Sequence, residues 1–257
     1  MATLDMQSVT TRDRRIILFC LFTVTALAWL YLVLLAQGMG NAIARPRGNI
    51  WTSTDFVLTF VMWVVMMLGM MLPSASPMIA MFARVSQRAP DRAGPFVPVW
   101  IFVAGYVVTW SGFSLVATIT QWALHYVGLI SPMLASSNAV FGGFVLIAAG
   151  VYQWTPLKHA CLRHCQSPFG FLMTRWRDGV GGAFKMGLSH GVYCVGCCWV
   201  LMSLLFVGGV MNLLWVATLA VLVLAEKIAP PGPWLSRIVG VALVFWGGWV
   251  LATAYLQ

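Results

Sequence analysis

Long apolar runs alternate with short polar segments along the whole chain, and this pattern predicts helices that cross a membrane. An α-helix needs about 20 mostly apolar residues to span a hydrocarbon layer of about 30 Å. We therefore predict an all-α fold, a polytopic membrane helix bundle with about seven spans. The predicted spans are residues 16–37, 56–83, 97–121, 139–154, 185–207, 213–225 and 235–255.

The chain divides into a short polar beginning and one apolar domain. Residues 1–15 are predicted to be a cytoplasmic tail, and residues 16–257 a single transmembrane helical domain. Thr52 and Asp55 have the spacing of a capping box before the second span, although a chance polar pair would look the same.

Two features interrupt the apolar pattern. Pro73 and Pro77 lie inside the second span, and each removes a backbone donor and crowds the preceding helical turn. We expect a sharp kink or break there, with the freed carbonyls facing protein or a cavity rather than lipid. Residues 155–184 form the one long polar segment between spans, and 169–176 within it could be a short interfacial helix.

Composition supports the membrane prediction. The chain is 61% hydrophobic and 8% charged, with a mean hydropathy of +0.88, whereas a soluble domain has about 25% charged residues. Its net charge of +9 does not indicate nucleic-acid binding, because the basic residues are distributed by side of the membrane. Thirteen of the 15 Lys and Arg lie in segments on the same side as the N-terminus, and Arg45 and Arg47 lie on the other. This bias predicts a cytoplasmic N-terminus and a cytoplasmic 155–184 segment.

The fifth predicted span carries the densest group of metal-ligating side chains. His190, Cys194 and Cys198 follow Met186 at intervals of four residues, and Cys197 lies close to the same helix face. Thiol and imidazole groups are costly in lipid unless they have partners, so we expect them to face the bundle and bind a metal. The alternative is that the cysteines are small apolar core residues.

The preceding polar segment adds further candidate ligands. Cys161, His164 and Cys165 have spacings that metal sites use, although one exposed helix face would show the same spacing. Five of the six cysteines lie between Cys161 and Cys198, at the same predicted end of the membrane. With a rise of about 1.5 Å per residue, the ligands would extend from the cytoplasmic mouth to the middle of the bilayer.

The predicted span 56–83 contributes a row of methionine thioethers. Two charged residues, Glu226 and Lys227, directly follow the predicted span 213–225. Thiolate, imidazole and thioether together suit Cu(I), whereas zinc would use only the first two. A methionine stripe is also ordinary core packing. Glu226 either holds a ligating histidine, His190 or His164, or forms an interfacial ion pair with an outward-pointing Lys227. The possible additional metal contacts are Met66, Met67, Met70 and Met71.

Several of these segments resemble a bacterial family described as predicted metal-binding integral membrane proteins. The resemblance covers about residues 55–230, and Cys197-Cys198-Trp199 is its most specific part. It implies a copper-related, metal-binding protein of the bacterial inner membrane. The matching segments are Trp63–Pro73, Leu157-Lys158 with Cys161-Leu162 and Cys165, His190-Gly191 with Cys194 and Gly196–Trp199, Met211–Leu213, and Glu226-Lys227.

These features lead to one main functional hypothesis and two alternatives. The main one is a protein that binds Cu(I) and hands it over, as a membrane chaperone, a transporter or an assembly factor for a copper enzyme. Its partners would be the lipid bilayer, the metal ion, and a copper-dependent membrane or periplasmic enzyme or a soluble metallochaperone. The alternatives are a thiol–disulfide oxidoreductase acting on a quinone through Cys194 and Cys197, and a non-catalytic complex subunit with structural zinc. A phosphate loop, a Ser/His/Asp set and an intramembrane carboxylate pair are not evident in the sequence, which disfavours most enzyme classes.

Overall fold

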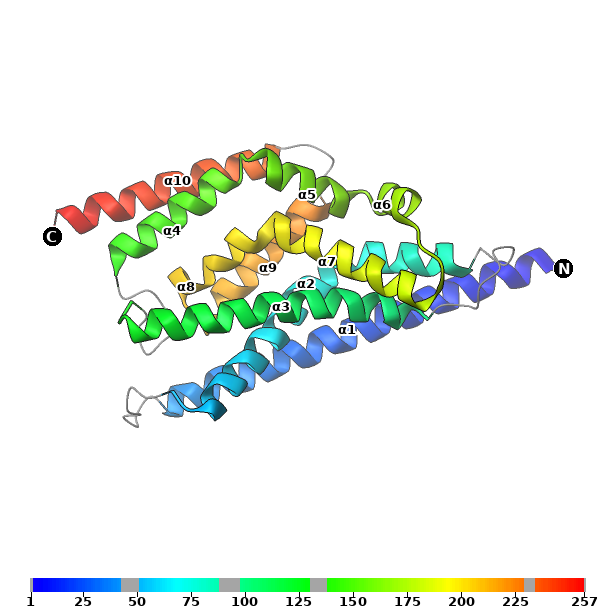
Figure 1. The fold of residues 1–257 in the computed structure, drawn as a ribbon, viewed down its shortest axis with the longest axis horizontal. Helices are drawn as coiled ribbons and strands as arrows, with labels where there is room; N and C mark the ends of the chain where they lie inside the picture. The colour runs from blue at the N-terminus through cyan, green and yellow to red at the C-terminus, as the bar shows by residue number, and fades with distance from the viewer. Residues whose placement is uncertain (1, 43–50, 88–97, 130–137, 229–233, 257) are drawn as a thin grey trace.

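The computed structural model describes residues 2–42, 51–87, 98–129, 138–228 and 234–256, and in these ranges all regular structure is helical (Figure 1). This confirms the all-α class. The helices are α1 (Ala2–Ala42), α2 (Ser53–Gln87), α3 (Val99–Tyr126), α4 (Ala139–Tyr152), α5 (Pro156–Gln166), α6 (Pro168–Arg175), α7 (Gly179–Ser203), α8 (Leu205–Gly208), α9 (Leu213–Ile228) and α10 (Trp234–Tyr255).

Most predicted spans coincide with a helix, and the differences lie at their ends. Helix α1 begins at Ala2, so the stretch predicted as a tail continues the first helix; no glycine or proline interrupts residues 2–15. The polar segment 155–184 contains α5 and α6, and α6 coincides with the expected short helix. Thr52 and Asp55 form the capping contacts, with the Asp55 amide 3.3 Å from Thr52 Oγ1 and the Thr52 amide 3.0 Å from Asp55 Oδ2.

A kink or a break was predicted at the two prolines, and helix α2 is not broken there but continues through both. Because Pro77 has no amide hydrogen, it cannot donate to the carbonyl of Pro73. The hydroxyl of Ser76 donates to that carbonyl instead, at 2.8 Å. Local hydroxyl groups thus stabilise the helix, as they do in membrane helices that contain proline.

Five described helices are long and apolar enough to cross a membrane, and they lie in α1, α2, α3, α7–α8 and α10. Helices α4 and α5 make a sixth candidate span if the pair is counted as one, broken by a 65° bend. The predicted number of seven is not confirmed, because α4 has 14 residues and α9 has 16. Each alone is shorter than the roughly 20 residues that a straight crossing needs.

Helix α7 occupies the middle of the bundle and packs most extensively against α3 (Figure 1). The two backbones touch at glycines: a Cβ at Gly187 would lie 1.9 Å from the carbonyl oxygen of Phe102, and one at Gly105 would lie 2.2 Å from that of Phe184. Thr109 Oγ1 also donates to the Leu188 carbonyl across the interface, at 3.2 Å. Small residues permit this close approach, which fixes the rotation of α7 about its axis.

Helices α4 and α10 form a pair along one edge of the bundle, and α5 follows α4 after the bend (Figure 1). The bend lies at 153–155, where α4 ends and the Thr155 hydroxyl accepts from the Lys158 amide at 3.3 Å to start α5. Turned in this way, α5 packs across α7 rather than extending beyond the bundle. The bend therefore brings the cysteines of α5 over those of α7.

Candidate metal site

One face of α7 presents all four of its predicted ligands to the protein interior. His190, Cys194, Cys197 and Cys198 are each at most 2% exposed. The opposite face is apolar and open, with Trp199 among its exposed residues. The predicted orientation of this helix face toward the bundle is therefore present in the structure, and the thiols do not face lipid.

Helix α5 completes a cluster of four cysteines. Helix α5 packs on α7 and places Cys165 near Cys194 and Cys197, and Cys198 lies near the same two residues. Cys161 lies beside the α7 backbone, since a Cβ added at Gly196 would be 2.8 Å from its sulfur. A glycine at this position leaves room for Cys161 between the two helices.

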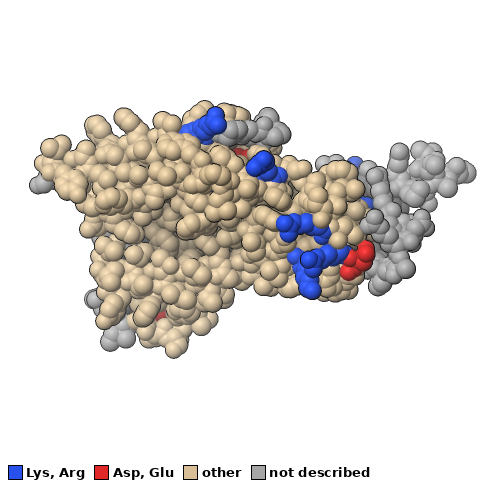
Figure 2. Space-filling model, turned by 45° about the horizontal axis from the view of Figure 1, so that its top comes forward, with Lys and Arg blue, Asp and Glu red and all other residues tan. Residues whose placement is uncertain are grey.

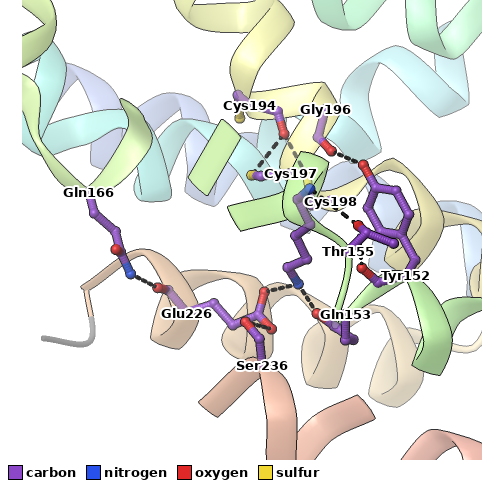
Figure 3. Close-up of polar contacts among 11 residues, drawn as sticks. Tyr152, Gln153, Thr155, Gln166, Cys194, Gly196, Cys197, Cys198, Glu226 and Ser236 are labelled. Atoms are coloured by element: carbon purple, nitrogen blue, oxygen red, sulfur yellow. Dashed lines mark hydrogen bonds and ion pairs between the residues drawn. The ribbon is translucent and has the colours of Figure 1, made fainter. Parts of the chain in front are cut away.

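The thiols of α7 are held by backbone hydrogen bonds in this structure (Figure 3). Cys197 and Cys198 both donate to the carbonyl of Cys194, at 3.1 and 3.0 Å. Within the described part of the chain, no three His, Cys, Asp or Glu side chains have the arrangement of a metal site. Metal binding would therefore require Cys197 and Cys198 to rotate away from that carbonyl.

Lys227 extends from α9 into the same cluster and is 7% exposed. Its ammonium group donates to Cys194 Sγ at 3.0 Å and to Ser74 Oγ at 2.8 Å. The Tyr106 hydroxyl lies 3.0 Å from the same sulfur and donates to the Met71 carbonyl at 3.1 Å. The outward-pointing lysine of the interfacial alternative is therefore wrong. A positive charge beside Cys194 stabilises negative charge on its sulfur.

The two predicted histidine ligands differ in their surroundings. His190 is packed among the rings of Phe102, Tyr106 and Phe171. Its Nδ1 is one of three buried side-chain atoms without a hydrogen-bond partner among the described residues. A buried polar atom without a partner is costly, so it marks a position where a ligand would be stabilised.

His164 is half-buried on α5 and stacks on Tyr193, with ring centroids 4.2 Å apart and planes at 2°. Its Nδ1 lies 2.9 Å from the carbonyl of Ala160. Because a carbonyl can only accept, this contact places the proton on Nδ1 and leaves the lone pair of a neutral ring on Nε2. His164 thus has one nitrogen that could ligate a metal.

All four methionines predicted as additional contacts are buried in the core. Met71 is the member that the described contacts bring to the cluster, since its sulfur lies 4.0 Å from the ammonium of Lys227. The other three, Met66, Met67 and Met70, belong to the hydrophobic core.

Glu226 has neither of its two predicted roles: it forms a buried ion pair with Lys158 and not with an outward-pointing Lys227, and its described contacts include no histidine (Figure 3). The Lys158 ammonium lies 2.7 Å from Glu226 Oε2 and also donates to Gln153. Ser236 donates to the other carboxylate oxygen at 3.2 Å. The pair joins α5 to α9, so the Glu226 carboxylate is directed to Lys158 and not to either candidate histidine ligand.

Comparison with known proteins agrees with this sulfur-rich interior. Residues 60–250 match the family described as PpoB2, copper chaperone. The chain belongs to the PpoB2 copper chaperone family. No curated protein and no solved structure matches it. The matched range includes the cysteine cluster, Lys158, Glu226 and Lys227, and it confirms the copper-related part of the predicted resemblance.

Breaking the buried ion pair of this PpoB2 chain is expected to destabilise it. In Lys158→Met the Glu226 carboxylate stays buried without a counter-charge, which costs about 3–5 kcal/mol. The thermal unfolding midpoint in detergent should fall clearly. The matched control is the double variant Lys158→Met/Glu226→Met, which removes both charges and should recover most of the loss. A double variant no more stable than Lys158→Met would contradict this account.

Sequence reasoning missed the charged and polar groups that surround the cysteines of this copper chaperone family member. Lys158 is fully buried, and Ser74 and Tyr106 are 7% and 0% exposed. One signal was available: charged residues within an apolar chain are usually paired inside the bundle. Their partners were not readable, because Lys158 and Glu226 are 68 positions apart.

Proposed function

We propose that this PpoB2 chain binds Cu(I) within the membrane at the cysteine cluster and hands it to a partner. The observation that carries the proposal is the burial of Cys194, Cys197 and Cys198 on one face of α7 beside the Lys227 ammonium, with α5 and its Cys165 packed against that helix. Soft thiolate ligands select Cu(I). Because Cu(I) accepts few ligands, a pair of thiolates from this cluster, assisted by His190 or Met71, is sufficient to hold it.

Charge balance favours Cu(I) over zinc as the cargo. Lys158 and Glu226 neutralise each other, which leaves Lys227 as the uncompensated buried charge among the described residues near the cluster. Cu(I) on two thiolates carries one net negative charge, and Lys227 brings the total to zero. Zn²⁺ in the same place would leave one buried positive charge, which the apolar interior disfavours.

We propose that the chain lies in the bacterial inner membrane with its N-terminus and the 155–184 segment in the cytoplasm. The long apolar helices support a membrane location. Described Lys and Arg side chains gather in the middle of the molecule and toward the end that carries the N-terminus, while the opposite end of this face shows no blue side chain (Figure 2). Basic segments are retained on the cytoplasmic side.

We propose that the metal is transferred to a partner because the cluster combines strongly binding thiolates in the interior with ligands nearer the surface, through which the metal can be exchanged. His164 and Cys165 lie on α5, which is half-buried and borders the polar surface, whereas Cys194 and Cys197 lie deeper. Thiolates at two depths allow the metal to pass from one pair to another without being released. The partner that receives the metal would be a copper-dependent membrane or periplasmic enzyme or a soluble metallochaperone.

The test is metal analysis of the purified protein in detergent, after anaerobic loading with Cu(I) or with Zn²⁺ and removal of free metal. We expect retained, stoichiometric copper and much less zinc. X-ray absorption at the copper edge should show sulfur neighbours. Retained zinc without copper would instead support a structural zinc site, and retention of neither metal would refute the proposal.

A further inference from the structure

A basic pocket opens beside the cysteine cluster, on its polar side. It has a volume of about 840 Å³ and lies between α5, the α6–α7 connection and the first half of α7. Small-molecule sites have volumes of about 300–1,000 Å³, so the pocket is large enough for a ligand of several dozen atoms. The lining residues that matter here are His164, Arg175, Arg177, Lys185, Met186 and Ser189.

Cationic groups dominate the charge of this pocket. Arg175, Arg177 and Lys185 are exposed, and no carboxylate in the described residues forms an ion pair with them. Arg175 lies over the ring of Tyr193, 5.1 Å from its centroid, and donates to the Tyr193 hydroxyl. The adjacent carboxylate, Asp178, accepts from the Trp176 indole at 2.8 Å. The remaining positive charge predicts an anionic ligand.

The pocket is lined by residues of the two helices that carry the cysteines, α5 and α7. His164 lines the pocket and is the neighbour of Cys165, and Met186 lines it one helical turn before His190. Tyr193, which stacks on His164 and accepts from Arg175, precedes Cys194 directly. A ligand held by the basic groups would therefore lie against His164, the residue before Cys165 on α5.

We propose that this pocket receives a small anionic thiol carrying Cu(I), and that Cys165 is the first thiol of the protein to take the metal. This inference rests on the proposed function, because it names the donor for the same cluster. Arg177 and Lys185 would bind the carboxylates of the carrier, and the metal–sulfur end would point toward His164 and Cys165. The size of the pocket favours a small carrier over the flat surface of a protein donor.

The transfer is a ligand exchange without a change of oxidation state. The Cu–S bond to the carrier breaks and a Cu–S bond to Cys165 forms. The proton of the Cys165 thiol goes to the released carrier thiolate, and we assign its passage to the lone pair of His164 Nε2 because His164 lines the pocket. Copper remains Cu(I), and the carrier leaves as a neutral thiol group.

Binding is tested first without metal, using reduced glutathione as the probe, titrated by calorimetry into the metal-free protein in an uncharged detergent. We expect saturable binding that weakens with salt and roughly tenfold weaker binding to Arg177→Gln/Lys185→Gln. The matched control is Arg237→Gln, which removes an exposed charge that does not line the pocket, and should bind like the parent. Equal binding by all three proteins, or no binding, would overturn the proposal.

Transfer is tested second, by stopped-flow measurement of copper uptake from its glutathione complex and from its complex with dithiothreitol, a neutral thiol. Uptake from the anionic carrier should be roughly tenfold faster, and Arg177→Gln/Lys185→Gln should lose that advantage while final copper loading is unchanged. If the protein retains copper but takes it equally fast from both carriers, the pocket proposal fails and the proposed function stands. If copper is not retained but glutathione binds, the proposed function fails and the pocket remains an anion site.

An anionic lipid headgroup would be the competing occupant of the pocket. The same glutathione titration distinguishes it from the small thiol carrier. A short-chain phosphatidylglycerol added in equal amount to the protein should leave glutathione binding unchanged. Displacement of glutathione by that lipid, together with unchanged copper uptake, would assign the pocket to lipid and overturn the proposal.

Discussion

Copper binding is expected to disappear when Cys194 and Cys197 are both replaced by serine. Cys194 contacts Lys227 and Tyr106, and both cysteines are buried on the face of α7 that packs inside the bundle. A serine hydroxyl is a hard, neutral group at physiological pH and does not replace a thiolate as a ligand for Cu(I). The thiols that remain on α5 and α7 are Cys161, Cys165 and Cys198, and none of them has the described contact with the Lys227 ammonium that Cys194 has.

The measurement is copper per protein after anaerobic loading, determined by elemental analysis. Loading of Cys194→Ser/Cys197→Ser should fall to the background of the detergent buffer. The control is Cys20→Ser, which removes an exposed cysteine of α1 outside the cluster and should load like the parent. Circular dichroism verifies the helical fold, which serine can maintain because its hydroxyl can contact Lys227 and Tyr106. Parent-like loading of the double variant would refute the site.

Replacing Lys227 by glutamine is expected to weaken Cu(I) binding and to shift the preference toward zinc. The ammonium lies 3.0 Å from the sulfur of Cys194 and is almost fully buried. Opposite unit charges about 4 Å apart attract by about 4 kcal/mol at an effective dielectric constant of about 20. Solvent screening and structural relaxation offset part of the lost attraction, so we expect roughly a hundredfold loss of Cu(I) affinity.

The decisive readout is the ratio of Cu(I) to Zn²⁺ affinity, because a general loss of structure would weaken both metals. Without the lysine, two thiolates with Zn²⁺ are neutral and two thiolates with Cu(I) carry a negative charge. Lys227→Gln should therefore lower the ratio, whereas Lys227→Arg, which keeps the charge, should recover much of it. Tighter Cu(I) binding by Lys227→Gln would show that the ammonium competes with the metal, contrary to this account.

Much of the helical fold was predictable because apolar runs are local signals. Helices α3 and α10 lie within a few residues of their predicted bounds, and so does the start of α9. The number of spans was not predictable in this way. Hydropathy records how apolar a segment is, whereas the 65° bend between α4 and α5 depends on how the short polar stretch 153–155 packs.

The sequence predicted the part of the candidate site that lies on a single helix, α7. The fourfold spacing of His190, Cys194 and Cys198 requires them to share a face, and their cost in lipid turns that face inward. The same reasoning failed for Glu226 and Lys227. Adjacent residues on a helix point about 100° apart, so one reaches Lys158 on α5 and the other reaches Cys194 on α7.

The sequence by itself determined an apolar, all-helical chain with a row of sulfur and imidazole groups on one helix and a basic excess in alternate segments. These properties depend on composition and on the helical repeat, which are local. The tertiary structure decided that Cys165 joins that row, that Lys227 supplies its counter-charge and that a basic pocket borders it. Contacts between residues tens of positions apart depend on how helices cross and bend, and the packing of side chains across the whole bundle sets those angles.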